Sequence, residues 1–265
     1  MPEALTISCL PRYLPRSDWP RAAANAIKQY PGNRPPGLEE DEVPQGNEGE
    51  RLALDVTRYW GSSVQLTVGF IETPDRALRD RILSHLNAWG EKANVHFMTA
   101  GVDPQVRIAR WTAQDSPGDE GFWSNLGTDI LLIEPHRPTM NLDAFTMSTP
   151  DSEFHRVVRH EAGHTLGFPH EHMRQAIVQR LDREKVIRAY MASQGWTRQE
   201  VIDQVLTPLE ESSLLGTPTA EEDSIMCYDI PGSLTLDGRA VQGGVDITPN
   251  DHAFAALVYP KAQSR

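Results

Sequence analysis

Disulfide bonds and long apolar runs are nearly absent from this chain. Only two of the 265 residues, Cys9 and Cys227, are cysteine. At most one disulfide can form, so packing must stabilise the fold. No stretch approaches the roughly 20 apolar residues of a membrane span. We therefore expect no membrane-spanning segment.

Basic residues are also scarce. The chain has 25 Lys and Arg against 37 Asp and Glu, a formal net charge of −12, and no Lys/Arg run long enough to form a phosphate-binding stripe. We therefore expect no nucleic-acid partner. The first thirty residues lack the uninterrupted apolar core of an export signal. Because no standard signal peptide is visible, localisation is open between the cytosol, a non-classical export route and earlier removal of a leader. Oligomeric state is not readable from the sequence.

Composition divides the chain into an extension and a main domain. With 39% apolar residues, 265 residues can bury a core as one large domain or two small lobes. Residues 31–51 are rich in Pro, Gly and acidic residues without apolar periodicity, which indicates a linker or extended surface segment. We expect an N-terminal extension or prosegment over 1–51 and a main domain over 52–265. Its upper lobe would span 52–167 and its lower lobe 168–265.

The periodicity of apolar residues predicts an α+β fold. Residues 63–70 alternate in the manner of a half-buried strand. Residues 75–93 have apolar side chains at helical spacing, which predicts an amphipathic helix. Short apolar runs at 95–98, 106–109 and 130–133 predict further strands. The expected result is a sheet of about five strands with the helix on one face.

Further helices are expected in the second half of the chain. The first begins at Thr149 and Pro150 and leads into the histidine motif described below. The others span 182–193, a segment opened by a capping box from Thr197 to Glu200, and a last helix that starts at Thr248. Residues 207–247 are rich in Gly and Pro and predict irregular structure.

The run HEAGHTLGFPH at 160–170 has the pattern H-E-x-x-H-x-x-G-x-x-H. On a helix, His160 and His164 lie on one face, roughly 6 Å of rise apart, and can both direct an imidazole nitrogen at one metal ion. Gly167 lets the chain leave the helix in a left-handed conformation, so that His170 can return as a third ligand. Three protein ligands leave the fourth position of tetrahedral Zn2+ open for water, which is typical of a catalytic site.

The full eleven-residue pattern is expected by chance on the order of once in ten thousand sequences. This rarity disfavours the alternative that the residues are ordinary helix histidines satisfied by core hydrogen bonds. Glu161 lies beside the predicted metal rather than on it. The sequence therefore predicts a catalytic zinc site with Glu161 next to it.

A second motif, SIMCYD at 224–229, follows some sixty residues later, and the third histidine continues as H-E-H at 170–172. Together with WSNLGTDILLI at 123–133, these motifs make the chain resemble the metzincin peptidases, and within them the astacins, over approximately residues 55–260. The resemblance implies a metzincin-type catalytic domain, with a twisted mixed sheet and an active-site helix in its upper lobe. The lower lobe would be mostly irregular or helical. It also implies Zn2+ as cofactor and a polypeptide as substrate.

The resemblance implies roles for residues outside the histidine motif. Met226 would form a hydrophobic floor beneath the imidazoles, a role that merges with plain core packing. Tyr228 would coordinate zinc at rest and swing away to stabilise the oxyanion, the alternative being a buried tyrosine with a hydrogen-bond partner. An edge strand would bind substrate as an added β-strand, the alternative being an ordinary edge strand. The residues assigned to that strand are Trp123, Ser124, Asn125 and Leu126.

The predicted function is therefore zinc-dependent endopeptidase activity on extended polypeptides. Zinc lowers the pKa of its bound water towards about 7, and Glu161 takes the proton as the water attacks and later hands it to the departing amine. A latent zymogen blocked by the N-terminal segment is an alternative. A zinc-containing protein that binds polypeptides without cutting them is another. Substrate identity cannot be predicted.

The chain departs from the astacin pattern in ways that leave alternatives open. Phe122 stands where a cysteine of an astacin disulfide is expected. Cys9 is a candidate thiolate for the open zinc position, a partner for a disulfide to Cys227, or an unremarkable thiol. We expect Cys227 to be packed rather than ligating. Glu171 and His172 form either a solvated pair at the helix exit or a buried network.

Overall fold

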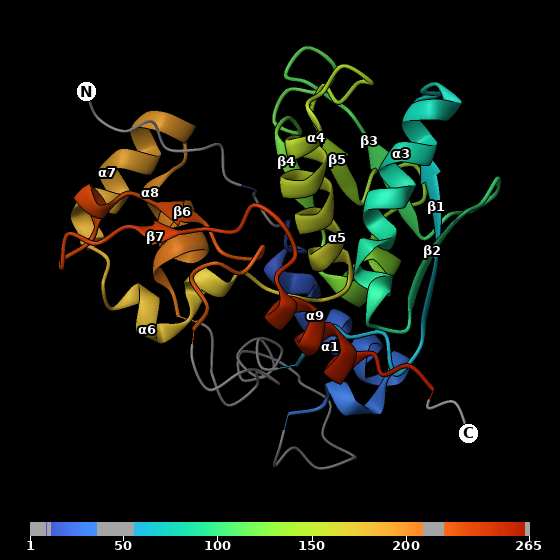
Figure 1. The fold of residues 1–265 in the computed structure, drawn as a ribbon, viewed down its shortest axis with the longest axis horizontal. Helices are drawn as coiled ribbons and strands as arrows, with labels where there is room; N and C mark the ends of the chain where they lie inside the picture. Colours follow the sequence, from blue (N-terminus) through green and yellow to red (C-terminus); the bar gives the residue numbers. More distant parts are fainter. Residues whose placement is uncertain (1–8, 10–11, 36–55, 209–219, 263–265) are drawn as a thin grey trace.

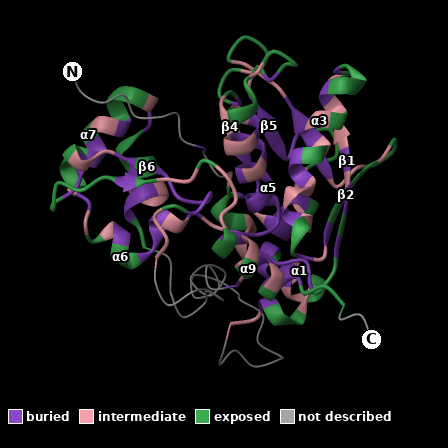
Figure 2. Ribbon diagram, in the orientation of Figure 1, coloured by how far each residue is buried: buried purple, intermediate pink, exposed green. Residues whose placement is uncertain are grey.

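The computed structural model describes residues 9, 12–35, 56–208 and 220–262. Figure 1 shows two lobes side by side, one built around a five-stranded sheet and a smaller one that is mostly helical with a two-stranded sheet. Figure 2 shows buried residues inside each lobe, where they form two large hydrophobic clusters. The predicted α+β class is confirmed.

The larger sheet has the strand order β2-β1-β3-β5-β4. Its strands are β1 (Val64–Phe70), β2 (Val95–Thr99), β3 (Val106–Ala109), β4 (Phe122–Ser124) and β5 (Met140–Leu142). Only β4 runs antiparallel to its neighbour within this sheet. β4 forms one edge, and Figure 1 shows this edge on the side of the smaller lobe. The strands predicted at 63–70, 95–98 and 106–109 are confirmed.

The strand predicted at 130–133 is wrong. These residues belong mainly to a 3-10 helix, Gly127–Leu132, and β4 pairs with β5 instead. The chain coils here because Gly127 has a φ of 45°, and a Cβ at that position would lie 2.0 Å from the Arg58 carbonyl oxygen. The coil also brings Asp129 into a buried ion pair with Arg58, with Nε and Oδ1 2.8 Å apart. A long-range contact thus overrides the local preference for strand.

Helix α3 (Arg76–Leu86) packs its apolar side, including Leu78 and Ile82, into the core of the larger lobe. The helix predicted over 75–93 ends earlier than expected and continues as a 3-10 turn at Asn87–Glu91. At this junction the Asn87 amide pairs with both main-chain groups of Phe97 in β2, each at 2.9 Å. The side chain thereby anchors the end of the helix to the sheet.

A continuous helix carries the histidine motif. It consists of α4 (Asp151–Glu153), a π-helical turn (Phe154–Val158) and α5 (Arg159–Thr165). Its N-cap is Pro150, without a side-chain cap, rather than the predicted Thr149. π-Helical turns are rare and frequently lie at functional sites. This one directly precedes His160.

The smaller lobe contains four short elements and one longer helix. They are α6 (Gln175–Val178), α7 (Arg183–Gln194), α8 (Arg198–Val201), β6 (Asp229–Ile230) and β7 (Val241–Gln242). The predicted capping box is present, with the Thr197 and Glu200 side chains each bonded to the other's main chain. The predicted irregular segment 207–247 lies partly outside the described residues.

The last helix, α9 (Pro249–Val258), packs with the larger lobe. Ala255 and Val258 belong to the same hydrophobic cluster as the five-stranded sheet. Thr248 is the N-cap, as predicted, and forms a capping box with Asp251. The part of the chain assigned to the lower lobe therefore returns to the upper one at its end.

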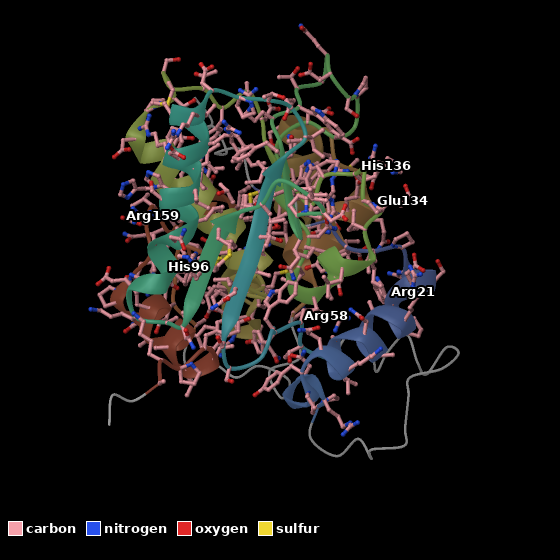
Figure 3. The ribbon with its side chains drawn as sticks, turned by 90° about the vertical axis from the view of Figure 1, so that its right-hand side faces the viewer. Arg21, Arg58, His96, Glu134, His136 and Arg159 are labelled. Atoms are coloured by element: carbon pink, nitrogen blue, oxygen red, sulfur yellow. The ribbon has the colours of Figure 1, made fainter. Side chains whose placement is uncertain are left out.

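The predicted N-terminal extension contains a helix, α1 (Trp19–Gln29), of which Ala23 and Ala26 pack against Val56. In Figure 3, α1 lies beside the lower end of the larger sheet, with Arg58 labelled between them. The predicted linker 31–51 and the start at Leu52 fall mostly outside the described residues, and the domain boundaries remain predictions. Among the described helices, none is long and apolar enough to cross a membrane.

Candidate metal centre and active site

The three motif histidines are brought together by α5 and its exit turn. His160 and His164 lie one turn apart on the helix. Gly167 has a φ of 93° and donates its N–H to the His164 carbonyl at 2.8 Å. The N–H of Phe168 donates to the Gly163 carbonyl at 3.0 Å. This is the hydrogen-bond pattern of a Schellman motif. The turn reverses the chain so that His170 faces the helix, as the spacing predicted.

The Nε2 atoms of the histidines face one another. Nε2 of His170 lies 3.2 Å from that of His160 and 3.0 Å from that of His164. Nδ1 of His160 lies 2.6 Å from the Ile225 carbonyl oxygen, and Nδ1 of His164 lies 2.8 Å from the Phe168 carbonyl oxygen. Because a carbonyl only accepts, both Nδ1 atoms carry the proton and both Nε2 atoms carry a lone pair.

Lone pairs that converge in a buried site repel one another unless a cation lies between them. One potential ligand atom each from His160, His164, His170 and Cys9 lies within 4.8 Å of the others, and all four residues are buried. Imidazole and thiolate are preferred Zn2+ ligands, and backbone carbonyls commonly orient such histidines. The donor set therefore fits zinc, although such sites also accept cobalt, nickel or copper in vitro.

Burial keeps the three imidazoles neutral. It lowers the pKa of His160 to about 4. It also lowers the pKa of His164 and of His170 well below the ordinary value, and neighbouring histidines add to both shifts. Neutral imidazole is the form that binds a metal.

Glu161 is fully buried beside this centre and is not part of the ligand set. Its Oε2 accepts a hydrogen bond from Cys9 Sγ at 3.3 Å, and its Oε1 has no partner among the described residues. Burial raises the pKa of Glu161 to about 8, against smaller opposing effects of the Cys9 hydrogen bond and the Arg156 charge. A carboxylate with a raised pKa next to a metal site is chemically suited to accept and return a proton.

Cys9 reaches the centre from the N-terminal segment, 152 residues from Glu161 in sequence. Cys9 and Cys227 are both free, so the disulfide between them is wrong. The Cys227 thiol instead lies 3.7 Å from the Tyr228 carbonyl oxygen and outside the ligand set. Burial, with the charge of Glu161 adding to it, raises the pKa of Cys9.

Met226 packs against the helix that carries the first two histidines. A Cβ on Gly163 would lie 2.4 Å from Met226 Sδ, so only glycine allows this approach. The Met226 carbonyl accepts the Glu171 N–H at 2.9 Å, while the preceding carbonyl, of Ile225, holds His160. The SIMCYD turn thus supports the histidines by packing and by hydrogen bonds, which agrees with the predicted position of Met226.

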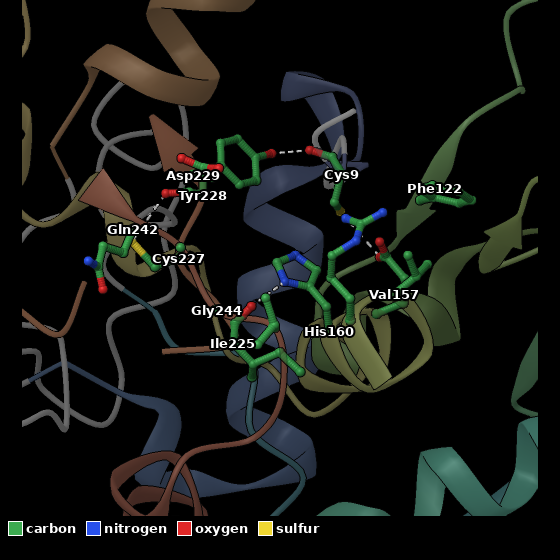
Figure 4. A pocket seen from close by; sticks show the side chains of 14 residues that line it. Cys9, Phe122, Val157, His160, Ile225, Cys227, Tyr228, Asp229, Gln242 and Gly244 are labelled. Carbon is green, nitrogen blue, oxygen red and sulfur yellow. Dashed lines mark hydrogen bonds between the residues drawn. The ribbon is translucent and has the colours of Figure 1, made fainter. Parts of the chain in front are cut away.

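Tyr228 lies beside the histidine centre with its hydroxyl directed at the N-terminal segment. Its ring stacks on His172 at a centroid distance of 3.9 Å and lies 4.3 Å from the ring of His170. Its hydroxyl donates to the Cys9 carbonyl, as Figure 4 shows. Burial raises the pKa of Tyr228. In this structure the tyrosine is therefore a buried hydrogen-bond donor, as in the alternative interpretation, placed next to the third histidine.

The residues after the third histidine are not a solvated pair, because His172 is buried, but the Glu171 side chain is 21% exposed. His172 is fully buried and lies 3.1 Å from the Gln204 carbonyl. Glu171 accepts the Glu221 N–H at 3.2 Å and pairs with Arg174 at 3.5 Å. Burial raises the pKa of Glu171 to about 7.

The predicted substrate-binding strand contacts the N-terminal segment. The Arg12 N–H donates to the Ser124 carbonyl at 3.2 Å, and Asn125 Nδ2 donates to the Arg12 carbonyl at 2.8 Å. Arg12 and Asn125 form a parallel β-bridge, and the Arg12 guanidinium lies 4.0 Å from the centroid of the Trp123 ring. Leu126, in contrast, is the N-cap of the 3-10 helix that follows. Three of the four predicted residues therefore contact the N-terminal segment, and their role in substrate binding stays a prediction.

A cavity of about 120 Å³ lies beside His160 (Figure 4). Its polar lining includes Glu161, Tyr228 and Arg156. Arg156 comes from the π-helical turn and pairs with Glu153 at 2.7 Å. Sequence reasoning missed this arginine, although its position four residues before His160 on the same helix could have indicated it.

Asp251 is a second residue that sequence reasoning missed. Its Oδ1 accepts the Ser224 hydroxyl at 2.6 Å and its Oδ2 accepts the Ile225 N–H at 3.0 Å. The same carboxylate accepts the Thr248 N–H at 2.9 Å at the start of α9. The T-x-x-D spacing signals the cap, but nothing local indicates that Asp251 also fixes the SIMCYD turn.

Comparisons with known proteins add to this geometry. No family model matches the chain, and no curated protein matches it. A solved structure of myroilysin is 30% identical, covers 78% of this chain and 97% of its own, and has a TM-score of 0.70. A crystal structure of myroilysin is 26% identical over 97% of this chain and 100% of its own, with a TM-score of 0.57. High choriolytic enzyme 1, a hatching enzyme zinc-protease from the medaka fish Oryzias latipes, shares the fold at 15% identity over 75% of this chain and 90% of its own, with a TM-score of 0.50.

The fold and the histidine centre together define a metalloendopeptidase of the metzincin class. The chain belongs to the astacin-like metzincin metallopeptidases. The resemblance carried by the sequence motifs is thereby confirmed.

Proposed function

We propose that the chain is a zinc-dependent endopeptidase that hydrolyses peptide bonds of extended polypeptides. The supporting observation is the convergence of three imidazole Nε2 atoms beside the buried carboxylate of Glu161. Zinc held by these histidines supplies a Lewis acid, which polarises a substrate carbonyl and lowers the pKa of water towards about 7.

Glu161 is the general base and acid in this proposal. Its carboxylate takes a proton from the attacking water and delivers it to the amine that leaves. Burial raises its pKa to about 8, whereas the charge of a bound zinc ion would favour the ionised carboxylate that accepts the proton. The free Oε1 leaves one oxygen available while Oε2 faces Cys9.

Tyr228 stabilises the oxyanion in this proposal. Its ring is held by stacking on His172, and its hydroxyl already donates to a carbonyl, that of Cys9. A phenol kept protonated by burial is a hydrogen-bond donor at neutral pH. Once the N-terminal segment leaves, the same donor can serve a substrate carbonyl.

Substrate binds along the free edge of β4. The main-chain groups of Ser124 and the amide of Asn125 already hold the backbone of Arg12. An extended polypeptide can use the same groups as an added strand, which gives affinity without demanding a particular side chain.

We propose further that the N-terminal segment keeps the enzyme latent. The support is that Cys9 has a potential ligand atom within 4.8 Å of those of the three histidines, and that the segment occupies the β4 edge at Arg12. A thiolate is a strong zinc ligand and fills the position that the reacting water needs. Cutting the chain between the segment and the main domain would then release activity.

The test is hydrolysis of an unfolded polypeptide such as denatured casein. A recognition sequence for a site-specific protease, placed within residues 36–51, allows the zinc-loaded chain to be cut after α1, so that Cys9, Arg12 and α1 can leave together. We expect little hydrolysis before the cut, hydrolysis after it, and inhibition by a chelator. Cys9→Ser should raise the activity of the uncut chain by at least about tenfold, because a hydroxyl is a weaker zinc ligand than a thiolate.

The outcomes separate the proposals. Activity of the uncut chain equal to that of the cut chain, with no effect of Cys9→Ser, would sink latency and leave the endopeptidase intact. One equivalent of bound zinc without hydrolysis, before and after cutting, would favour the non-hydrolytic polypeptide-binding protein.

A further inference from the structure

The side chain of Arg12 occupies a built site next to β4. Its guanidinium donates to the Asp119 carboxylate, and its NH2 donates to the Gly118 carbonyl at 2.7 Å. The guanidinium also lies over the face of Trp123, 4.0 Å from the ring centroid. A carboxylate, a carbonyl and an aromatic face thus surround one cation.

With Arg12 in place, the carboxylate and the aromatic face of this site are largely buried, whereas Gly118 is exposed. The Asp119 side chain is 11% exposed and Trp123 is 2% exposed. The Trp123 indole N–H donates to the Asp119 carbonyl at 2.9 Å, which fixes the aromatic face relative to the carboxylate. Oδ2 of Asp119 is held by Ser116 at 2.7 Å and by Arg137 at 3.0 Å, whereas Oδ1 is bonded to Arg12.

Departure of the N-terminal segment leaves a defined vacancy in this network. Oδ1 of Asp119 loses its charged donor, and a buried acceptor without a partner is unfavourable. Burial on its own would raise the pKa of Asp119, but hydrogen bonds from Ser116 and Arg12 and the charges of Arg12 and Arg137 lower it below the ordinary value. Arg137 then remains as a charged donor to Oδ2, while Oδ1 is open to a new cationic donor.

The backbone contacts of Arg12 connect this site to the substrate path. Its N–H and carbonyl are bonded to Ser124 and Asn125, the groups assigned above to substrate binding. Cys9 lies at the metal centre and Arg12 is three residues further along, at most about 10 Å in an extended chain. A substrate strand on the same edge therefore presents a side chain to Asp119 and Trp123 two to four residues from its scissile bond.

We propose that Asp119, Trp123 and the Gly118 carbonyl form a substrate subsite for arginine or lysine, which the enzyme's own Arg12 fills in the latent chain. The inference rests on the proposed function, because it assumes that substrate replaces the N-terminal segment on β4. It adds a side-chain preference to a cleft that otherwise binds main chain.

The first experiment measures hydrolysis by the cut, zinc-loaded enzyme. Peptides carry arginine, lysine, norleucine or glutamate in turn at each of the four positions on either side of the scissile bond. We expect kcat/KM to be about tenfold higher for arginine than for norleucine at one position two to four residues from the bond, mostly through KM. Asp119→Asn should remove most of this preference. Glu134→Gln, which alters an exposed carboxylate outside this network, should preserve it.

The second experiment needs no turnover. Fluorescently labelled peptides are titrated by anisotropy into cut, zinc-loaded Glu161→Gln protein, and the arginine peptide should bind about tenfold more tightly than its norleucine counterpart. Equal binding and equal hydrolysis of the two peptides would overturn the subsite. Absence of hydrolysis with a retained arginine preference in binding would instead refute the proposed function and support the subsite.

Discussion

Two clusters of potential metal ligands each take two members from the helix that spans Asp151–Thr165, and they differ in what surrounds them. The first is the centre at His160, His164 and His170; the second brings His85 and Asp151 to His155 with potential ligand atoms equally close, within 4.8 Å. In the first, carbonyls accept from two Nδ1 atoms and leave Nε2 lone pairs facing one point.

The second cluster is closed by arginines. Arg159 makes two of the contacts: its Nε donates to His85 Nδ1 at 3.3 Å, and its NH1 donates to Asp246 at 2.6 Å. Arg81 makes the third, because its NH2 donates to Asp151 at 2.8 Å. Because Nδ1 of His85 accepts, its Nε2 carries the proton and cannot ligate. The comparison teaches that the hydrogen bonds behind the ligands, rather than the ligand types, distinguish a metal centre from an ion-pair network.

The largest expected difference between the two clusters is in the amount of zinc that the protein loses when a histidine is replaced. His164→Ala should lower zinc from about one equivalent to near zero and abolish hydrolysis, because two histidines hold the ion poorly. His85→Gln is the matched control and should retain about one equivalent. Elemental analysis after gel filtration measures both. A loss of zinc in His85→Gln would contradict the distinction.

The next effect is on catalysis with the metal in place. Glu161→Gln should lower kcat of the cut enzyme by about a hundredfold to ten-thousandfold while zinc stays bound, because the amide cannot accept the proton. Single-turnover hydrolysis and metal analysis of the same sample measure this. Near-normal kcat would remove Glu161 from the proposed mechanism.

Breaking the arginine-closed cluster should have a modest effect on stability. Asp246→Asn removes the charge that pairs with Arg159 at 2.6 Å and with His155 at 2.7 Å. Because the Asp246 side chain is 42% exposed, we expect a loss of about 1 kcal/mol or less in the free energy of unfolding. Urea denaturation measures it, with Asp237→Asn, another partly exposed carboxylate, as the control. A loss of several kcal/mol in the free energy of unfolding would contradict the assignment of Asp246 to a weak, partly exposed ion pair.

The remaining effect is the pH dependence of stability. Burial and the charges of Arg159 and His155, with Arg81 adding and Asp151 opposing, lower the pKa of His85 to about 4. The unfolded chain then binds this proton at higher pH than the folded one, so stability is complete above about 6.5 and falls as pH drops towards 4. The free energy of unfolding changes by at most about 1.4 kcal/mol per pH unit through this one group. His85→Gln should reduce the change in the free energy of unfolding between pH 7 and 5, measured by urea denaturation. A substitution of the exposed His136 should not reduce it. An unchanged slope in His85→Gln would assign the dependence to other groups.

Local patterns predicted the parts of the site that are close in sequence. The positions of His160 and His164 follow from the helical repeat, and the left-handed turn at Gly167 follows from glycine chemistry. The strand at 63–70 and the capping box at Thr197 were predicted for the same reason. These features depend on neighbours within one or two turns of chain.

Contacts between distant residues could not be predicted. The coil at 127–132 depends on Arg58, some seventy residues earlier, so the short apolar run alone suggested a strand. The sequence left three alternatives for Cys9 open, because its partner Glu161 is 152 residues away. Asp251 likewise contacts the SIMCYD turn only after α9 has packed on the other lobe.

The double duty of Asp251 connects the metal centre to the last described helix. One carboxylate caps α9 and also orients the loop whose Ile225 carbonyl holds His160. A chain truncated before this residue would possess all three histidines without the support that aims the first of them. A substitution at the start of α9 should therefore weaken zinc binding, although it lies far along the chain from every ligand.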